Sequence, residues 1–165
     1  MAHVKCRAEV AKRSGKFLDW QRCGTCGQMF TGAMQLGLAE AWVRRTANRP
    51  EGDDKRLGAS MFMGKALYGQ GKYAEAEAIY RETLAVQKRV LGDENESTLA
   101  TAMNLAVSLN KQGKYAEAEA MYRENLTIKR RVLGEEHKHT LSTAGNLAIT
   151  LDDQGKYAEA EAMYR

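Results

Sequence analysis

The sequence predicts an all-α solenoid built from helix-turn-helix repeats, and three observations support this fold class. The block G-K-Y-A-E-A-E-A occurs three times, beginning at Gly71, Gly113 and Gly155, so the period is 42 residues. Residues 71–112 and 113–154 are identical at 26 of 42 positions, spread over the whole unit. Apolar residues within each unit recur at helical spacings of three and four. A repeat of this length buries its apolar face against neighbouring copies, as solenoids do.

Each unit is expected to contain two helices separated by a polar turn. The first helix covers about residues 73–91 and is followed by Gly92, which can adopt the left-handed backbone angles of a helix C terminus. Residues 93–97 form a polar turn that ends in candidate N-cap residues, and the second helix covers about residues 98–112. Within Y-A-E-A-E, tyrosine and alanine are expected to pack between helices, and the glutamates are expected to be solvated.

One repeated pattern reads N-L-A-x-x-L-x-x-Q-G-K-Y-A-E-A-E-x-x-Y-R-x-x-L and continues to V-L-G. It resembles the long tetratricopeptide repeat of kinesin light chains and related proteins. The resemblance covers residues 55–165, which hold about 2.5 units, the last of them incomplete. It implies a right-handed α-superhelix whose first helices line a concave, peptide-binding groove. Because such repeats serve many assemblies, the fold alone assigns no partner.

Polar residues follow one face of the leading helices in the second and third repeats. An asparagine amide carries a donor and an acceptor, so it can hold the backbone of an extended peptide. The family resemblance implies this role for Asn104 and Asn146, whereas the alternative is that both only bond neighbouring turns. Phe62 stands at the equivalent position of the first repeat, so a peptide is expected to lie over repeats two and three. The predicted groove residues are Asn104, Asn146, Thr101, Ser108, Lys111, Thr143, Thr150 and Asp153.

The segment over residues 33–54 is expected to form a capping helix, at about residues 33–47, followed by a boundary loop with the lone proline. A shift of 42 residues aligns the apolar face of this helix with that of the helix beginning at Tyr73. It is therefore expected to occupy the place of a preceding repeat's second helix. The next helix, at about residues 55–70, contains three interior glycines and is expected to be the least regular. The apolar face of the capping helix holds Met34, Leu38 and Trp42.

Composition and charge narrow the classes of function. The chain is 44% hydrophobic and 28% charged, which is ordinary for a globular protein. Residues 1–50 hold nine Lys/Arg against three Asp/Glu, but Arg44 and Arg45 are interpreted as a solvated helix end rather than a nucleic-acid patch. No apolar run reaches membrane-spanning length, and three cysteines argue against a secreted disulfide framework. A cytoplasmic protein is expected, with a protein or peptide partner and with neither nucleic acid nor membrane.

Residues 1–32 contain the candidate metal ligands. His3 and Cys6 form H-x2-C, and Cys23 and Cys26 form C-x2-C. Two-residue spacers let both members of a pair bind one ion, and zinc takes four thiolate or imidazole ligands in a tetrahedron. The alternative is that His3 is a frayed terminal residue and the cysteines are reduced thiols.

With Trp20 before the third ligand and Phe30 after the fourth, this segment resembles the C-terminal half of a RING-CH zinc finger, a domain associated with ubiquitin ligases. The resemblance implies two zinc sites, whose four upstream cysteines this sequence lacks. Zinc binding by this partial, RING-CH-like remnant is therefore expected to be weak or incomplete. No nucleophile–base pair or phosphate-binding glycine loop is found, so a noncatalytic scaffold is expected. The alternative function is the substrate-selecting part of a RING-CH-type ubiquitin ligase.

Overall fold

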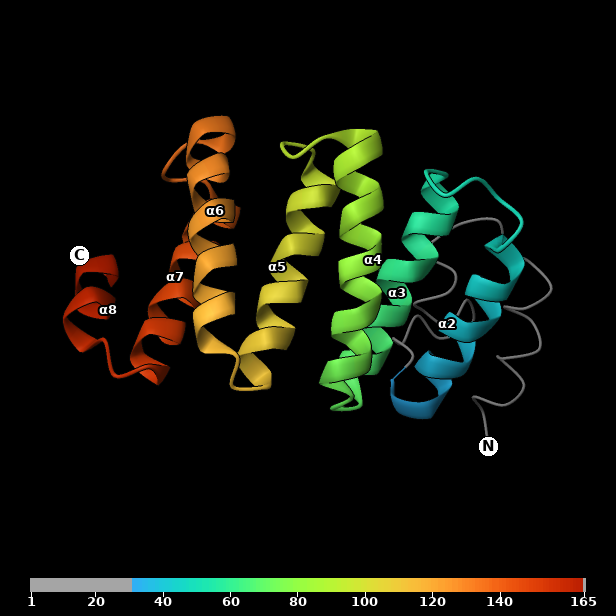
Figure 1. The fold of residues 1–165 in the computed structure, drawn as a ribbon, viewed down its shortest axis with the longest axis horizontal. Helices are drawn as coiled ribbons and strands as arrows, with labels where there is room; N and C mark the ends of the chain where they lie inside the picture. The colour runs from blue at the N-terminus through green and yellow to red at the C-terminus, as the bar shows by residue number, and fades with distance from the viewer. Residues whose placement is uncertain (1–30, 165) are drawn as a thin grey trace. The chain divides into compact units, whose positions relative to one another are not determined.

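The structure is a computed structural model that describes residues 31–164, in which every regular element is an α-helix and no strand occurs (Figure 1). The predicted all-α class is therefore confirmed. The chain divides into two compact units, Met1–Lys72 and Tyr73–Arg165. The helices are α2 (Gly32–Thr46), α3 (Asp54–Gly69), α4 (Tyr73–Leu91), α5 (Glu96–Lys111), α6 (Tyr115–Leu133), α7 (Lys138–Asp153) and α8 (Tyr157–Tyr164).

The 42-residue period of the sequence is also the period of the helices. Helices α4 and α6 have 19 residues each, α5 and α7 have 16 each, and both pairs are offset by 42 residues. Gly92 has a φ angle of +87°, which a side chain would disfavour, so α4 ends where the sequence predicts. Helix α5 begins at Glu96, two residues before the predicted start. The reason is that the Asn95 side chain caps it by accepting a hydrogen bond from the Ser97 amide at 2.9 Å.

In the unit Tyr73–Arg165, helices α4 to α8 pack one after another, each against the next in sequence. Figure 1 shows consecutive helices running in opposite directions. Tyr80 and Tyr122 occupy equivalent positions on α4 and α6, and each is only 1% exposed. Ala76 and Ala118, one turn earlier, are completely buried and let the adjacent helices approach closely. Within Y-A-E-A-E, the predicted packing role is therefore confirmed for the second alanine. The tyrosine of that block is only half-buried at Tyr73 and Tyr115 and is 67% exposed at Tyr157, so its predicted packing between helices is not confirmed.

In the unit Met1–Lys72, helix α2 packs against α3. Leu38 and Trp42 are buried, as their positions equivalent to Tyr80 and Leu84 predict. The Trp42 ring lies 5.9 Å from that of Phe62, centroid to centroid, with the planes tilted by 57°. Helix α3 has 16 residues without interruption, like α5 and α7, so the prediction that it is the least regular helix is wrong. The apolar cluster around Phe62 offsets the low helix propensity of its glycines.

Within Tyr73–Arg165, one glutamate links each 42-residue repeat to the next: Glu77 at the first junction and Glu119 at the second. Glu119 on α6 accepts hydrogen bonds from Lys156 Nζ at 2.7 Å and from Gln154 Nε2 at 2.8 Å, both in the next turn. It also accepts one from Arg123 Nε at 2.9 Å, one helical turn away on α6. Glu77 on α4 accepts the equivalent three bonds, and we call these two sets the inter-repeat clamps. The donors to Glu77 are Lys114 at 2.7 Å, Gln112 at 2.7 Å and Arg81 at 2.9 Å.

The clamps correct the prediction that the glutamates of Y-A-E-A-E are solvated, but only for the second glutamate, since the first is exposed in all three blocks. The side chains of Glu77 and Glu119 are only 11% and 13% exposed. Burial raises the pKa of Glu77, but the bonds from Lys114, Gln112 and Arg81 outweigh it and lower the pKa to about 2. The clamps thus explain why glutamine, lysine, the second glutamate and arginine recur in Q-G-K-Y-A-E-A-E and Y-R.

Candidate protein-interaction face

The predicted groove residues lie on α5 and α7, which carry the same sequence pattern one period apart. Met103 on α5 connects the two helices, because its Sδ lies 3.9 Å from Thr143 Oγ1 and 4.0 Å from Asn146 Nδ2. We call this surface, with Asn104 and Asn146 at its centre, the α5–α7 face. It lies entirely within the unit Tyr73–Arg165.

Four of the predicted groove residues are fully buried and cannot contact a ligand. Thr101, Ser108, Thr143 and Thr150 are each 0% exposed. Their hydroxyls donate to the carbonyl four residues earlier in their own helix, at 2.8 to 2.9 Å. These hydroxyls therefore belong to the packed base of the α5–α7 face rather than to its contact surface.

Asn104 and Asn146 are half-buried and reach the surface. The Asn146 amide makes only the long contact with Met103 Sδ among the described residues, and no hydrogen bond of the Asn104 amide to another described residue is found. The alternative that both amides bond neighbouring turns finds no support in this part of the chain. Both amides therefore keep most of their donor and acceptor capacity for a ligand.

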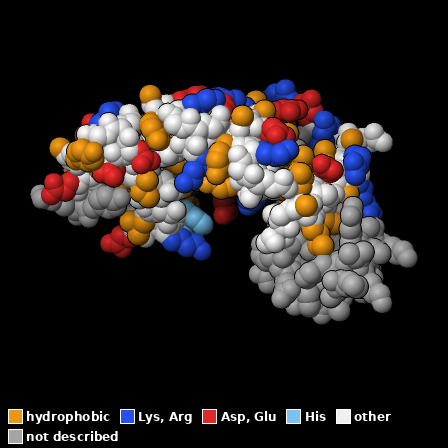
Figure 2. Space-filling view, turned by 90° about the horizontal axis from the view of Figure 1, so that it is seen from below, with side chains coloured by type: hydrophobic (Ala, Val, Ile, Leu, Met, Phe, Trp, Pro, Cys, Tyr) orange, Lys and Arg blue, Asp and Glu red, His pale blue; other side chains and the backbone are white. Residues whose placement is uncertain are grey.

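Lys111 and Asp153 are exposed and end helices α5 and α7, one residue before each helix C-cap. They are equivalent positions with opposite charge, so they do not form one charged subsite. Figure 2 likewise shows acidic and basic side chains interspersed, rather than gathered by sign, on the face it presents. His137 is the N-cap of α7 and accepts a bond from the His139 amide at 3.3 Å, a structural role.

Lys129 on α6 was not predicted, yet it lies directly behind the α5–α7 face. Its Nζ donates to Thr143 Oγ1 at 2.9 Å, and the residue is only 6% exposed. Burial lowers the pKa of Lys129, and no carboxylate is found to pair with it among the described residues. The equivalent residue of α4 is Gln87, also buried. The sequence signal for Lys129 was the change from Gln87 to lysine at the equivalent position of the next repeat, which could have marked Lys129 as a candidate functional residue.

Comparison with known proteins places the repeats in a family. The family model described as tetratricopeptide repeat matches residues 56–124 and again residues 97–165, which together make up more than half of the chain. This chain belongs to the tetratricopeptide-repeat (TPR) family. The resemblance seen in the repeated pattern is thereby confirmed for the repeats.

Solved structures share the TPR fold. A crystal structure of nearly identical TPR-like repeats of kinesin light chain type from Podosopora anserina has a TM-score of 0.74 and 22% identity, covering 98% of this chain and 71% of that one. The crystal structure of a variant of that protein gives the same values. BtubC (BKLC) from P. vanneervenii has a TM-score of 0.71 and 21% identity, covering 78% of this chain and 52% of that one. At these identities the likeness shows the fold alone. A comparison with curated proteins finds no match.

The predicted zinc ligands of this TPR protein, His3, Cys6, Cys23 and Cys26, lie outside the described residues, as does the RING-CH resemblance. Within residues 31–164, no group of three or more His, Cys, Asp or Glu side chains is placed to hold a metal ion. None of the helices in that range is long and apolar enough to cross a membrane. The domain boundaries predicted after residues 32 and 54 stay predictions.

Proposed function

We propose that this TPR protein is a noncatalytic scaffold that binds an extended peptide segment of a protein partner across the α5–α7 face. TPR repeats generally mediate protein–protein interactions. The observation that carries the finer proposal is the recurrence of half-buried Asn104 and Asn146 at the same register of two leading helices. The contact of Met103 with Thr143 and Asn146 gives the two helices one continuous surface on which a peptide backbone can lie.

The two asparagines have complementary capacity for a peptide backbone. Each amide can donate to a peptide carbonyl through Nδ2 and accept from a peptide N–H through Oδ1. Because these bonds involve only the main chain, they set the position of the peptide and not its sequence. Lys111 and Asp153, at the exposed ends of α5 and α7, are placed to select the side chains of the partner. We propose a cytoplasmic setting, since three cysteines do not form a closed disulfide framework.

The test begins with a partner captured by affinity pull-down and a peptide mapped from it. Titration calorimetry is then repeated with Asn104→Ala and with Asn146→Ala. Each variant is expected to weaken binding by about 1–3 kcal/mol, because a desolvated peptide group loses its partner. Thermal melting should show both variants folded.

Asn110→Ala is the matched control, because Asn110 lies on α5 but its Nδ2 is committed to Thr150 Oγ1 at 2.7 Å. It should leave affinity unchanged in protein that remains folded. Phe62→Ala cannot serve as the control, because Phe62 is 2% exposed in the core of the other unit. Unchanged affinity with both Asn104→Ala and Asn146→Ala would show that the partner uses another surface.

For the N-terminal segment we propose weak or incomplete zinc binding by His3, Cys6, Cys23 and Cys26, on the basis of their paired spacing. Elemental analysis of chelator-washed protein tests this. One tightly held zinc per chain would contradict the proposal. Nothing among the described residues favours the ubiquitin-ligase alternative, which stays a prediction from the resemblance.

A further inference from the structure

The two helices of the α5–α7 face differ in charge at their C-terminal ends. Helix α5 has Asn110 and Lys111 there, which together carry one positive charge, whereas α7 has Asp152 and Asp153, which carry two negative charges. Lys111, Asp152 and Asp153 are exposed, and none of them forms an ion pair with another residue in the described part of the chain. Two repeats that are otherwise nearly the same therefore present opposite, uncompensated charges at equivalent positions.

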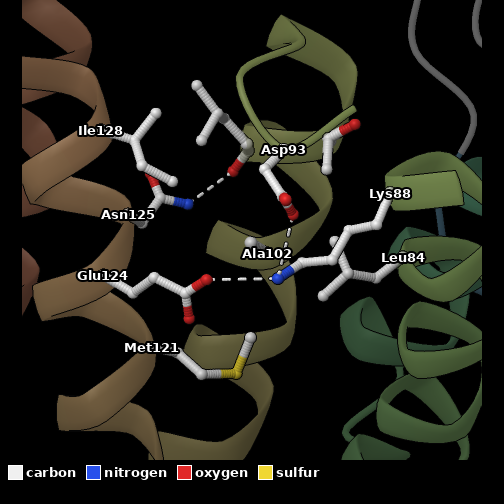
Figure 3. A pocket seen from close by; sticks show the side chains of 10 residues that line it. Leu84, Lys88, Asp93, Ala102, Met121, Glu124, Asn125 and Ile128 are labelled. Atoms are coloured by element: carbon white, nitrogen blue, oxygen red, sulfur yellow. Dashed lines mark hydrogen bonds and ion pairs between the residues drawn. The ribbon is translucent and has the colours of Figure 1, made fainter. Parts of the chain in front are cut away.

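Charged side chains on the other side of α5 are already used within the fold. In the small pocket between α4, α5 and α6, Lys88 Nζ lies 3.3 Å from Asp93 Oδ1 and 3.2 Å from Glu124 Oε1 (Figure 3). The two carboxylates are thus neutralised in part by one ammonium that belongs to the same chain. The ends of α5 and α7, in contrast, offer charges that a partner can pair with while every ion pair of the fold stays intact.

The two helix ends lie next to each other. The Asn110 Nδ2 donates to Thr150 Oγ1 at 2.7 Å, so the residue before Lys111 touches α7 one helical turn before Asp153. Helices whose side chains touch in this way have axes about 10 Å apart. An extended peptide rises about 3.3 Å per residue and turns every second side chain to the same side, so side chains two or four positions apart span about 7 or 13 Å. One such pair can therefore reach both helix ends.

The charged residues share a helix face with the proposed peptide-binding asparagines. Lys111 follows Asn104 by seven residues, and Asp153 follows Asn146 by seven. Seven residues are two turns of a helix, or about 10 Å along its axis. Helical side chains lean toward the N terminus, so those of Lys111 and Asp153 lean toward the level of the asparagines. A peptide whose backbone lies on Asn104 and Asn146 has its side chains within the combined reach of two long side chains from these charges.

We propose that the α5–α7 face selects peptides that carry an acidic and a basic residue two or four positions apart, with the acid at Lys111 and the base at Asp153. The inference rests on the proposed function and adds the charge class of the peptide. A peptide with two like charges is attracted by one helix end and repelled by the other. Asp152 adds a second negative charge to the end of α7 and so strengthens the contrast with α5.

The experiment uses the full chain and synthetic nonapeptides, acetylated and amidated, in which serine and valine alternate. Two serines, two or four positions apart, are replaced by glutamate and lysine, by two glutamates, by two lysines or by two glutamines. Binding is followed through the backbone amide shifts in two-dimensional NMR. The mixed peptide, at one of the two spacings, should bind about threefold more tightly than either like-charged peptide, as expected from one exposed charge pair.

Charge-reversal variants test the assignment of each end. Lys111→Glu makes both ends acidic, so the two-lysine peptide should become the tightest ligand. Asp153→Lys places a positive charge on the face of both helices, so the two-glutamate peptide should become the tightest. The double variant Lys111→Asp/Asp153→Lys should restore the preference for the mixed peptide. Glu82→Lys, a charge reversal at an exposed position of α4, is the control and should leave the ranking of the peptides unchanged.

The outcomes separate this inference from the proposed function. The charge selection is overturned if the mixed peptide binds no better than the like-charged ones. It is also overturned if the wild type, Lys111→Glu and Asp153→Lys rank the peptides alike. Should binding ignore these charges and still be weakened by Asn104→Ala, the proposed function stands and only the charge selection fails. Saturable binding by none of the peptides would overturn both.

Discussion

Replacing Glu119 with glutamine tests whether the inter-repeat clamps hold neighbouring repeats together. Glu119 accepts three hydrogen bonds, two of them from the turn that begins the next repeat. The bond from Lys156 is the largest cause of its low pKa, which lies at about 2 although burial opposes the shift. Glutamine keeps the size of the side chain and one acceptor oxygen but removes the charge.

The size of the effect follows from this pKa. A fall from 4.5 to about 2 corresponds to roughly 3 kcal/mol, at about 1.4 kcal/mol for each tenfold change in proton affinity. This is an upper limit, because the Lys156 and Arg123 side chains are 40% and 47% exposed and water screens their charges. We therefore expect Glu119→Gln to lower the free energy of unfolding by about 1–2 kcal/mol at pH 7.

The assay is urea unfolding at several pH values, followed by circular dichroism. Because the folded pKa of Glu119 lies below the unfolded value, the clamp contributes fully above about pH 5 and is lost as the pH falls toward about 2. The difference between the wild type and Glu119→Gln should therefore shrink to near zero at that end of the range. Glu77, with a pKa also at about 2, adds the same dependence to both proteins.

The control is Glu82→Gln, which removes a charge from an exposed position on α4 outside both clamps. It should change the free energy of unfolding by less than about 0.5 kcal/mol. The reasoning would be refuted if Glu119→Gln and Glu82→Gln behaved alike at pH 7. It would also be refuted if the loss at Glu119 persisted undiminished at about pH 2.

Two further predictions concern stability. Gly113 has a φ angle of +75°, so Gly113→Ala should lower the free energy of unfolding by about 1–2 kcal/mol. Gly145 lies within α7 with open space around it, so Gly145→Ala should raise the free energy of unfolding by up to about 1 kcal/mol. Thermal melts of the two variants test both predictions. Lys129→Met should raise stability by about 1 kcal/mol at pH 7, because an unpaired ammonium leaves the interior while Thr143 keeps its bond to the His139 carbonyl. Since the pKa of Lys129 is lowered in the fold, its protonation penalises folding at neutral pH, and the advantage of Lys129→Met should shrink in urea titrations near about pH 10.

The helices could be predicted because their determinants are local. The period of 42 residues and the glycine at position 92 mark where helices end, and the bounds of α4 agree with the prediction. The start of α5 was missed by two residues because either Asn95 or a later residue of the same polar turn can cap a helix. Only the bond from the Ser97 amide decides between them.

The rest depended on contacts between distant segments. Both glutamates of Y-A-E-A-E look alike in sequence, and only the position of a lysine 37 residues later shows that Glu77 is the buried one. The hydroxyls of Thr101 and Ser108 share a helical face with Asn104, yet bonds within the helix and burial remove them from the surface. A pattern read along one helix cannot show how deeply the neighbouring helix covers each position.

The inter-repeat clamps have a consequence for how a chain like this one can lengthen. Each 42-residue unit carries an acceptor that suits the unit after it and donors that suit the unit before it, as Glu77 with Lys114 and Glu119 with Lys156 illustrate. A tandem duplication within the gene would therefore supply a new copy with both halves of the contact already matched. No compensating substitution would be needed at the new junction. The chemistry of the junction is inherited with the copy, so growth by whole units is the mutational step that disturbs this fold least.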